Sequence, residues 1–301
     1  MRGASKGGRL TQVSVIIASK DRAAYLDQAL RSLSEQIGDP SFEAIVIDNG
    51  SSDATPQVVD RAREAYDFEI SYLYEERPNR AAARNRGITV AQGDLALFVD
   101  DDVWLPPGFL AAHTLAHGGR VPTAVSGPII NVPTYHDRPK PGLANFSRAF
   151  FCTCNVSVPV AALRDVRGFD EQFHLYGWED TELGIRLRES GVRSKFCWDA
   201  YLYHIKPPAE QTLDVTLVRT LEKAHMAARF IRKNTSRRAR LATGAYPWNF
   251  WRARALAPKW LLPLYAGFAA DERVPPLVRA VARHQLLDGM YVHELQRGLH
   301  P

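Results

Sequence analysis

Short apolar segments alternate with amphipathic helical segments through the first 120 residues of this 301-residue chain. The first segment, Val13 to Ala18, is rich in β-branched side chains, as expected of a strand buried on both faces. The expected strands are Val13–Ala18, Phe42–Ile47, Phe68–Tyr74 and Leu95–Val99, and the expected helices are Ala23–Gln36, a segment capped by Ser51-Ser52-Asp53 that runs to Tyr66, and Arg80–Ala91. This alternation predicts βαβ units around a mostly parallel sheet, an α/β fold of the Rossmann-like kind.

The pattern becomes more irregular after residue 120 and then purely helical. Further strands are expected at Thr123–Val132, Phe150–Val158 and Arg193–Trp198, the last closing at Tyr203-His204, with helices at Val160–Val166 and Asp180–Ser190. From Leu213 the pattern is helical, and an apolar stripe from Leu217 to Ile231 predicts a long helix that packs on the sheet domain. The pattern of the last 55 residues predicts helices that are shorter than this one. We therefore expect a flexible N-terminus (1–10), a sheet domain (11–210) and a C-terminal helical extension (211–301).

Composition and cysteine usage indicate a cytoplasmic globular protein. Apolar residues make up 46% of the chain and aromatic residues 10%. The three cysteines (Cys152, Cys154 and Cys197) are odd in number and lack metal-ligand spacing, which fits reduced thiols. Residues 1–10 lack the apolar core of a secretory signal. The best candidate for a membrane span, Leu256–Ala270, is too short and contains two prolines.

Positive charge is concentrated in one segment of the predicted extension. Residues 215–259 contain eleven Lys and Arg against the single acid Glu222, whereas the remainder has 27 basic and 32 acidic residues. A local net charge of +10 favours an anionic partner such as a membrane surface, lipid phosphate or nucleic acid. A solvated helix face explains it equally well. If the segment lies at the inner face of a membrane, Trp248, Phe250 and Trp251 are candidate interfacial anchors.

Three adjacent carboxylates, Asp100, Asp101 and Asp102, follow the expected strand at Leu95–Val99. Three neighbouring negative charges repel one another unless a cation or hydrogen-bond donors offset them. The carboxyl ends of parallel strands are where open α/β sheets bind ligands, and hard divalent metals favour carboxylate oxygens. A solvated acidic turn is the simpler alternative, but the abrupt change from apolar strand to acids favours a metal and phosphate site.

Other polar residues are expected at the same edge of the sheet. Asp48 ends the second strand, where it can accept hydrogen bonds from a ribose or base. Asp102 is the candidate that holds a divalent cation bridging a diphosphate. Arg84 lies near the start of a helix and can meet phosphate or base edges, although taken alone it is better explained as a helix-surface arginine.

A second acidic cluster, Glu179-Asp180, begins a helix directly after Gly177-Trp178. A carboxylate pair at a helix N-terminus is favoured by the helix dipole and can serve only as a cap. An indole beside a carboxylate, however, offers a sugar a stacking surface and an attacking hydroxyl a proton acceptor. His204, which ends a later strand, becomes a candidate metal ligand if it lies beside the acids.

Six segments, in this order, resemble glycosyltransferase family 2, with its GT-A fold. They are Val-Ser-Val-Ile-Ile-Ala-Ser-Lys-Asp-Arg (13–22), Ile-Val-Ile-Asp-Asn-Gly-Ser-Ser-Asp (45–53), Ala-Arg-Asn-Arg-Gly (83–87), Phe-Val-Asp-Asp-Asp (98–102), Gly-Phe-Asp-Glu (168–171) and Gly-Trp-Glu-Asp-Thr-Glu-Leu (177–183). The resemblance covers about residues 12–206. It implies an inverting transfer of a sugar from a nucleotide-diphosphate donor to an acceptor hydroxyl, with Mn²⁺ or Mg²⁺ as cofactor.

The resemblance also implies roles for individual residues. Asp48, Arg84, Asp100 and Asp101 are expected to bind the nucleotide, and Asp102 and His204 the metal. Asp180 is expected to be the general base, with Glu179 beside it and with Trp178 and Glu179 contacting the acceptor. The acceptor is a glycan, a lipid or a small molecule, and nucleic acid is not expected as a partner.

Two other classes of protein share parts of this pattern. A nucleotidyltransferase also combines a Rossmann-like sheet with acidic metal ligands, but it normally has a glycine-rich phosphate loop after the first strand, where this chain has Ala18-Ser19-Lys20-Asp21-Arg22. A non-catalytic module that binds nucleotide sugars is the second alternative.

Overall fold

The computed structural model describes residues 12–38, 41–119, 121–147, 149–207 and 212–300. The predicted flexible N-terminus, residues 1–10, lies outside the described residues. The chain divides into two compact units, the first formed by Met1–His174 and Glu179–Lys206 and the second by Leu175–Trp178 and Pro207–Pro301. The loop 175–178 therefore belongs with the helical unit, although it interrupts the first unit in sequence.

A seven-stranded sheet forms the centre of the first unit, in the order β3-β2-β1-β4-β8-β6-β9. The strands are β1 (Val13–Ser19), β2 (Phe42–Asp48), β3 (Glu69–Tyr74), β4 (Leu95–Asp100), β6 (Thr123–Ser126), β8 (Asn155–Pro159) and β9 (Arg193–Phe196). The four strands β3, β2, β1 and β4 are mutually parallel, as the alternating pattern predicted, whereas β8 runs antiparallel to β4 and β6.

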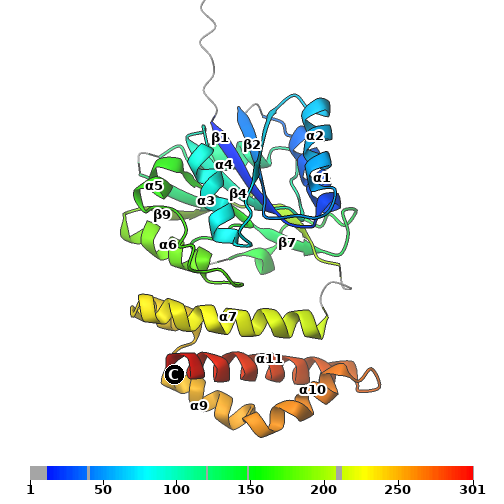
Figure 1. Cartoon of the computed structure of the whole chain (residues 1–301), viewed down its shortest axis with the longest axis vertical. Coiled ribbons are helices and arrows are strands. Elements are labelled where there is room, and N and C mark those ends of the chain that lie inside the picture. Colours follow the sequence, from blue (N-terminus) through cyan, green and yellow to red (C-terminus); the bar gives the residue numbers. More distant parts are fainter. Residues whose placement is uncertain (1–11, 39–40, 120, 148, 208–211, 301) are drawn as a thin grey trace, which may run out of the picture. The chain divides into compact units, whose positions relative to one another are not determined.

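Helices cover both faces of this sheet (Figure 1). On one face α1 (Ala23–Ser34), α2 (Thr55–Ala65) and α4 (Phe109–Ala116) share a core with alternate β1 residues such as Val15 and Ile17. On the other face α3 (Arg80–Val90), α5 (Val160–Asp165) and α6 (Glu179–Glu189) pack around Ile16 and Phe98. Because successive strand residues point to opposite faces, the uninterrupted apolar run of β1 supplies both cores.

The segment predicted as one strand at Thr123–Val132 is two strands in different sheets. β6 ends at Ser126, and β7 (Ile129–Val132) joins β5 (Val103–Trp104) and β10 (Leu202–Ile205) in a three-stranded sheet of order β5-β10-β7. Gly127 and Pro128 separate the two. A Cβ at Gly127 would lie 1.8 Å from the carbonyl oxygen of Ala200, so only glycine allows this close backbone approach. Likewise Tyr203-His204 belongs to β10 rather than to the strand that begins at Arg193.

Two further local predictions were wrong for identifiable reasons. β8 begins at Asn155 instead of Phe150, because the backbone N–H of Thr153 donates to the Asp180 carboxylate and the N–H of Asn155 donates to the carbonyl of Cys152. α2 begins at Thr55 with Ala54 as its N-cap, and Asp53 instead accepts hydrogen bonds from the N–H groups of Thr55 and Ala23. In both segments, hydrogen bonds to nearby polar groups take the place of the strand or helix start that the sequence predicted.

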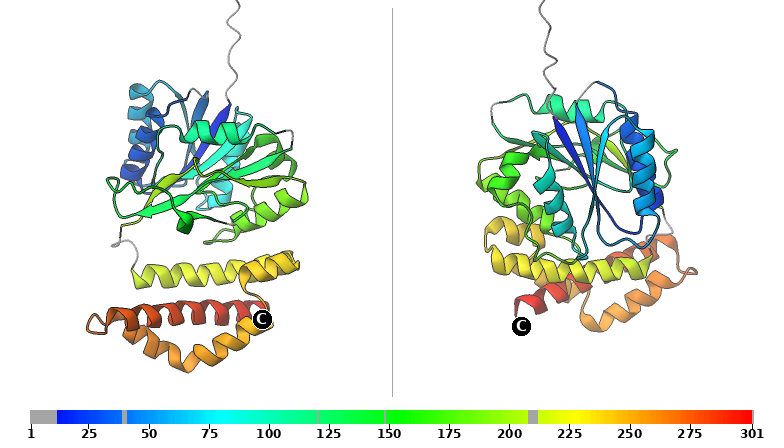
Figure 2. Two further views of the ribbon diagram at one scale, coloured as in Figure 1. Left: turned by 180° about the vertical axis from the view of Figure 1, so that it is seen from behind. Right: turned by 45° about the horizontal axis from the view of Figure 1, so that its top comes forward.

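The second unit is built from helices: α7 (Leu213–Lys233), α8 (Arg237–Thr243), α9 (Pro247–Leu256), the 3₁₀ turn η3 (Lys259–Leu261), α10 (Leu262–Ala270) and α11 (Pro276–Leu299). α11 has 24 residues, so the prediction of only short helices at the end of the chain was wrong. It lies between α7 and the pair α9 and α10 (Figures 1 and 2). Ala228, in the predicted stripe of α7, packs closely against Gly298 of α11. Among the described helices, none combines the length and the apolar character needed to span a bilayer.

Candidate functional site

The parallel strands place one acid on each side of β1. Asp48 of β2 lies in register with Ser19, and Asp100 of β4 lies in register with Ala18. Asp48 is buried, and its carboxylate accepts hydrogen bonds from the N–H of Ser51 at 2.7 Å and from the hydroxyl of Tyr72 at 2.7 Å. The carboxyl edge of the sheet therefore carries carboxylates at the ends of the two strands that flank β1, as predicted from the sequence.

The other two acids of the triplet are buried and bound by the protein's own donors. Asp101 accepts a hydrogen bond from the Ser19 hydroxyl at 2.7 Å, and burial raises its pKa to about 6. Asp102 Oδ2 lies 2.5 Å from Arg22 Nη1 and 2.8 Å from Lys206 Nζ. Burial alone would raise the pKa of Asp102, but the contacts with His204 and Lys206 outweigh it and lower that pKa far below its ordinary value. Two cationic side chains and His204 thus surround the Asp102 carboxylate.

His204 faces both ends of the acidic triplet. Its Nε2 lies 3.0 Å from Asp102 Oδ1 and 3.9 Å from Asp100 Oδ2, while Nδ1 lies 3.1 Å from Asn131 Oδ1. Each ring nitrogen thus has an oxygen within hydrogen-bond distance, Nδ1 that of Asn131 and Nε2 that of Asp102, and these contacts hold Nε2 toward the carboxylates. Such an outer hydrogen bond is how proteins orient a metal-binding histidine.

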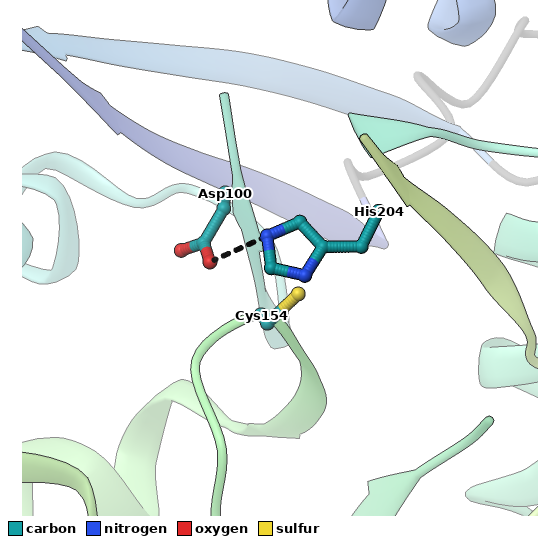
Figure 3. A group of neighbouring side chains, drawn as sticks. All are labelled: Asp100, Cys154 and His204. Carbon is teal, nitrogen blue, oxygen red and sulfur yellow. Dashed lines mark ion pairs between the residues drawn. The ribbon is translucent and has the colours of Figure 1, made fainter. Parts of the chain in front are cut away.

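Asp100, Cys154 and His204 each offer a ligand atom, and these atoms all lie within 4.8 Å of one another (Figure 3). Carboxylate and imidazole donors suit Mn²⁺, and carboxylates suit Mg²⁺. Asp100 and His204 thus fit a divalent cation, and Asp102 lies beside them with Oδ1 3.0 Å from His204 Nε2. Burial raises the pKa of the Cys154 thiol well above its ordinary value, so this residue borders the donor set as a neutral group.

A second cluster is centred on Arg84, which is only 8% exposed. The expectation that Arg84 is a helix-surface arginine was therefore wrong. Its guanidinium lies 3.2 Å from Glu179 Oε1, 3.9 Å from Asp180 Oδ1 and 3.7 Å from Asp100 Oδ1. One buried cation thus lies within ion-pair distance of three carboxylates. It also joins the Glu-Asp pair of α6 to the acidic triplet, because Asp100 is within ion-pair distance of both Arg84 and His204.

The two oxygens of Asp180 have different environments. Oδ2 accepts hydrogen bonds from the N–H and the hydroxyl of Thr153, at 3.0 and 3.1 Å. Oδ1 is buried and makes no hydrogen bond within the described part of the chain. Burial and the neighbouring charge of Glu179 raise the pKa of Asp180 to about 7, against the opposing effect of Arg84. The carboxyl is thus oriented through one oxygen and poised to exchange a proton near neutral pH.

Trp178 belongs to the helical unit. It has a positive φ of 76°, and its indole N–H donates to the carbonyl of Lys223 at 2.8 Å. Lys223 Nζ lies 5.3 Å from the centre of the indole, and the Phe230 ring lies 6.1 Å away. The side chain is therefore anchored on α7, and the predicted acceptor contact of Trp178 stays a prediction.

Several polar residues of this site were not predicted from the sequence, namely Arg22, Asn131, Thr153, Cys154 and Lys206. Cys154 reaches Asp100 because antiparallel pairing sets Asn155 of β8 opposite Val99 of β4. The only sequence signal was a cysteine close to an expected strand, which is too common to single out. Lys206 follows β10 directly, so a search for charges at strand ends could have found it.

The chain matches known proteins over most of its length. A family model described as Glycosyl transferase family 2 matches residues 14–153, and one described as the N-terminal domain of galactosyltransferase matches residues 134–207. Validoxylamine A glucosyltransferase of Streptomyces hygroscopicus subsp. limoneus is 30% identical over 267 residues, which cover 74% of this chain and 57% of that protein. The chain thus spans little more than half the length of this curated relative.

Solved structures with the same fold include two bound to nucleotide sugars. A mannosyltransferase from Pyrobaculum calidifontis, in complex with GDP-Man and Mn²⁺, has a TM-score of 0.66 and 20% identity, covering 96% of this chain and 86% of that one. Staphylococcus aureus TarS in complex with UDP-GlcNAc has a TM-score of 0.54 and 21% identity, covering 95% and 91%. These neighbours establish the GT-A fold. The matching family model, the ordered motifs and the similarity to validoxylamine A glucosyltransferase show that the chain belongs to glycosyltransferase family 2.

Proposed function

We propose that this protein is an inverting glycosyltransferase that moves a sugar from a nucleoside diphosphate donor to an acceptor hydroxyl. One observation carries the proposal: Asp100 lies within ion-pair distance of both His204 and Arg84, and Arg84 in turn contacts Glu179. The residues that could bind a metal therefore lie next to the Glu179-Asp180 pair. A displacement reaction needs both parts, because the leaving diphosphate gains charge while the acceptor hydroxyl loses a proton.

Asp180 is proposed as the general base. A base works best when its pKa lies near the operating pH, and the pKa of Asp180 is raised to about 7. The two hydrogen bonds from Thr153 fix the orientation of the carboxyl, and Oδ1, which has no hydrogen bond, is the oxygen that accepts the proton. Arg84 offsets part of the negative charge of the pair, and Glu179, which also contacts Arg84, is proposed to position the acceptor.

Asp48, Asp100, Asp101 and Arg84 are proposed to bind the nucleotide. Two family neighbours of the same fold bind UDP-GlcNAc and GDP-Man, so a nucleoside diphosphate sugar is the expected donor class. Asp48 lies one strand away from Asp100 across β1, on the side of Tyr72. Two carboxylates separated by one strand suit the hydroxyl and amide donors of a nucleoside.

Asp102 and His204, with Asp100 beside them, are proposed to hold Mn²⁺ or Mg²⁺. When bound, the cation supplies Lewis-acid stabilisation of the departing diphosphate. Arg22 and Lys206 keep Asp102 ionised and add two positive charges at the same carboxylate. The contact of Asn131 with Nδ1 holds the imidazole so that Nε2 faces Asp100 and Asp102.

The direct test is a panel of UDP- and GDP-sugars, screened by thermal shift with and without Mn²⁺, followed by measurement of nucleoside diphosphate release with glycan, lipid and small-molecule acceptors. We expect one donor to raise the melting temperature only when Mn²⁺ is present. Proton NMR of the first product should show the anomeric configuration opposite to that of the donor. Retention of configuration, or pyrophosphate release instead of nucleoside diphosphate release, would contradict the proposal.

A further inference from the structure

An unusual amount of apolar surface is exposed in the second unit. Trp248 is 64% exposed, Trp251 59% and Trp260 78%, and Leu264 and Phe268 of α10 are also exposed. α10 buries no side chain, and its nine residues, Leu-Pro-Leu-Tyr-Ala-Gly-Phe-Ala-Ala, include no charge. Exposed apolar surface on this scale marks an interaction site more often than a solvated face.

A cavity of about 600 Å³ lies within the second unit, and the exposed Trp251 forms part of its lining. Three arginines line it, Arg232, Arg240 and Arg254, together with Phe250 and Trp251, and none of its described lining residues is acidic. Arg240 and Arg254 are exposed. Guanidinium groups converging on one cavity form a site for an anion with several oxygens, above all a phosphate.

The aromatic surface and the arginine cavity are continuous. Trp251 lines the cavity and stacks on Trp248, with ring centres 4.8 Å apart and planes inclined by 22°. Arg254 follows Trp251 by one turn of α9, so it projects from the same helix face. Phosphate-binding and apolar groups therefore lie side by side, which matches a molecule that is itself both anionic and apolar.

We propose that the arginine cavity binds the phosphate headgroup of an anionic phospholipid, and that Trp248 and Trp251 beside it dock at the membrane interface, together with the exposed apolar residues of α10. The +10 segment 215–259 supplies attraction to an anionic leaflet, and Trp is the side chain that most favours the headgroup region. The inference is independent of the glycosyl transfer proposed above, because its test measures lipid binding alone.

Other occupants fit these observations less well. A nucleic acid would match the arginines but would leave the uncharged α10 surface against a polyanion. A second copy bound through a twofold axis would bring the same patch against itself and set the arginine cavities close together, where their charges repel. A bilayer with anionic lipids offers phosphate groups to the arginines and an apolar interior to the exposed apolar side chains.

The test is co-sedimentation of the full chain with vesicles of phosphatidylcholine alone or with 30% phosphatidylglycerol. We expect binding to the anionic vesicles in 50 mM NaCl and release in 500 mM NaCl, since salt screens the charge attraction. The variant Arg240→Gln/Arg254→Gln should bind about 30-fold more weakly, from the cost of removing two arginines near an anionic surface. Equal binding to both vesicle types would overturn the proposal.

A matched control separates the cavity from general charge. Arg237→Gln/Arg238→Gln removes the same charge from two exposed positions of α8 that do not line the cavity. It should lose clearly less binding than the cavity pair, and equal losses would overturn the cavity as the headgroup site. Trp248→Ser/Trp251→Ser should weaken binding to both vesicle types.

Calorimetry with monomeric short-chain phosphatidylglycerol adds a test on the unmodified chain. We expect saturable 1:1 binding, with no comparable heat from inorganic phosphate at the same concentration. Equal affinity for inorganic phosphate would show that the cavity takes free phosphate instead of lipid. A concentration-dependent dimer that Trp248→Ser/Trp251→Ser abolishes, without any vesicle binding, would assign the surface to a second copy.

Discussion

The guanidinium of Arg84 on α3 lies 3.2 Å from the Glu179 carboxylate on α6, although 95 residues separate them in the chain. The same arginine reaches Asp180 and Asp100, so one buried cation connects the acidic end of β4 with the start of α6. Helices from separate βα units thus complete a single site. Its parts can be tested one at a time.

Replacing Asp180 by Asn should lower kcat by about 10²–10⁴-fold, the usual contribution of a general base. Asn cannot accept the hydroxyl proton, but it retains the size of Asp and the oxygen that faces Thr153. Nucleotide binding measured by calorimetry should therefore be unchanged. Asp165→Asn, at an exposed position at the end of α5, is the matched control and should retain full turnover. Turnover of Asp180→Asn near that of the unmodified enzyme would exclude Asp180 as the base.

The rate should depend on pH through the same carboxyl. The pKa of Asp180 is raised to about 7, mainly by burial, so the ionised base is lost as pH falls below 7. We expect kcat/KM to be constant above this pH and to fall by about tenfold for each further pH unit below it. The residual kcat/KM of Asp180→Asn should not show this fall near pH 7. A profile that is flat from pH 5 to 8 would argue against the assignment.

Removal of the Arg84 charge should destabilise the fold and shift the pH profile. Arg84→Gln leaves Glu179 buried without its cation, and breaking a buried ion pair costs about 3–5 kcal/mol. Urea unfolding measures that loss. Because Arg84 lowers the pKa of Asp180, the midpoint of kcat/KM should also move to higher pH. Arg61→Gln, at an exposed position of α2, removes the same charge and should change neither quantity appreciably.

Divalent cation affinity should depend on Asn131 as well as on the ligands. Asn131→Ala removes the hydrogen-bond partner of His204 Nδ1, and loss of such a positioning partner typically weakens metal binding by about 10–100-fold. Mn²⁺ binding can be followed by electron paramagnetic resonance of the free ion, without any assay of turnover. His204→Ala should weaken binding at least as much. Unchanged Mn²⁺ affinity in both variants would place the cation elsewhere.

A buried histidine pair should make the fold sensitive to acid. Burial lowers the pKa of His113 to about 3 and that of His117 to about 4, and both rings contact the Ser157 hydroxyl at 2.8 Å. In the unfolded chain these residues take up protons near pH 6.5, so their contribution to stability is complete above pH 6.5 and is lost as pH falls toward 4.

The slope attributable to each histidine can reach about 1.4 kcal/mol per pH unit. Asp101 and Asp180 have raised pKa values and act in the opposite direction. The informative quantity is therefore the difference between variant and unmodified protein. His117→Gln should flatten the decline in the free energy of unfolding between pH 6.5 and 4. An identical decline in both proteins would show that His117 does not titrate as described.

The sequence by itself determined the parallel half of the sheet and the acids at its edge. β1, β2 and β4 could be predicted because buried parallel strands are apolar on both faces, a pattern that lies entirely within short segments. The position of Asp48 and Asp100 at strand ends follows from the same local pattern. The Thr123–Val132 segment was misjudged, because its division between two sheets depends on the contact of Gly127 with Ala200.

Only the tertiary structure decided which other residues complete the site. Arg22, Asn131, Cys154 and Lys206 lie in four separate segments, and each meets the acidic triplet or His204 only once distant strands have paired. Arg84 looked like a surface arginine because burial depends on what packs against a helix, and α6 follows almost a hundred residues later. Strand ends are encoded locally, whereas the environment of a charge is set by the whole fold.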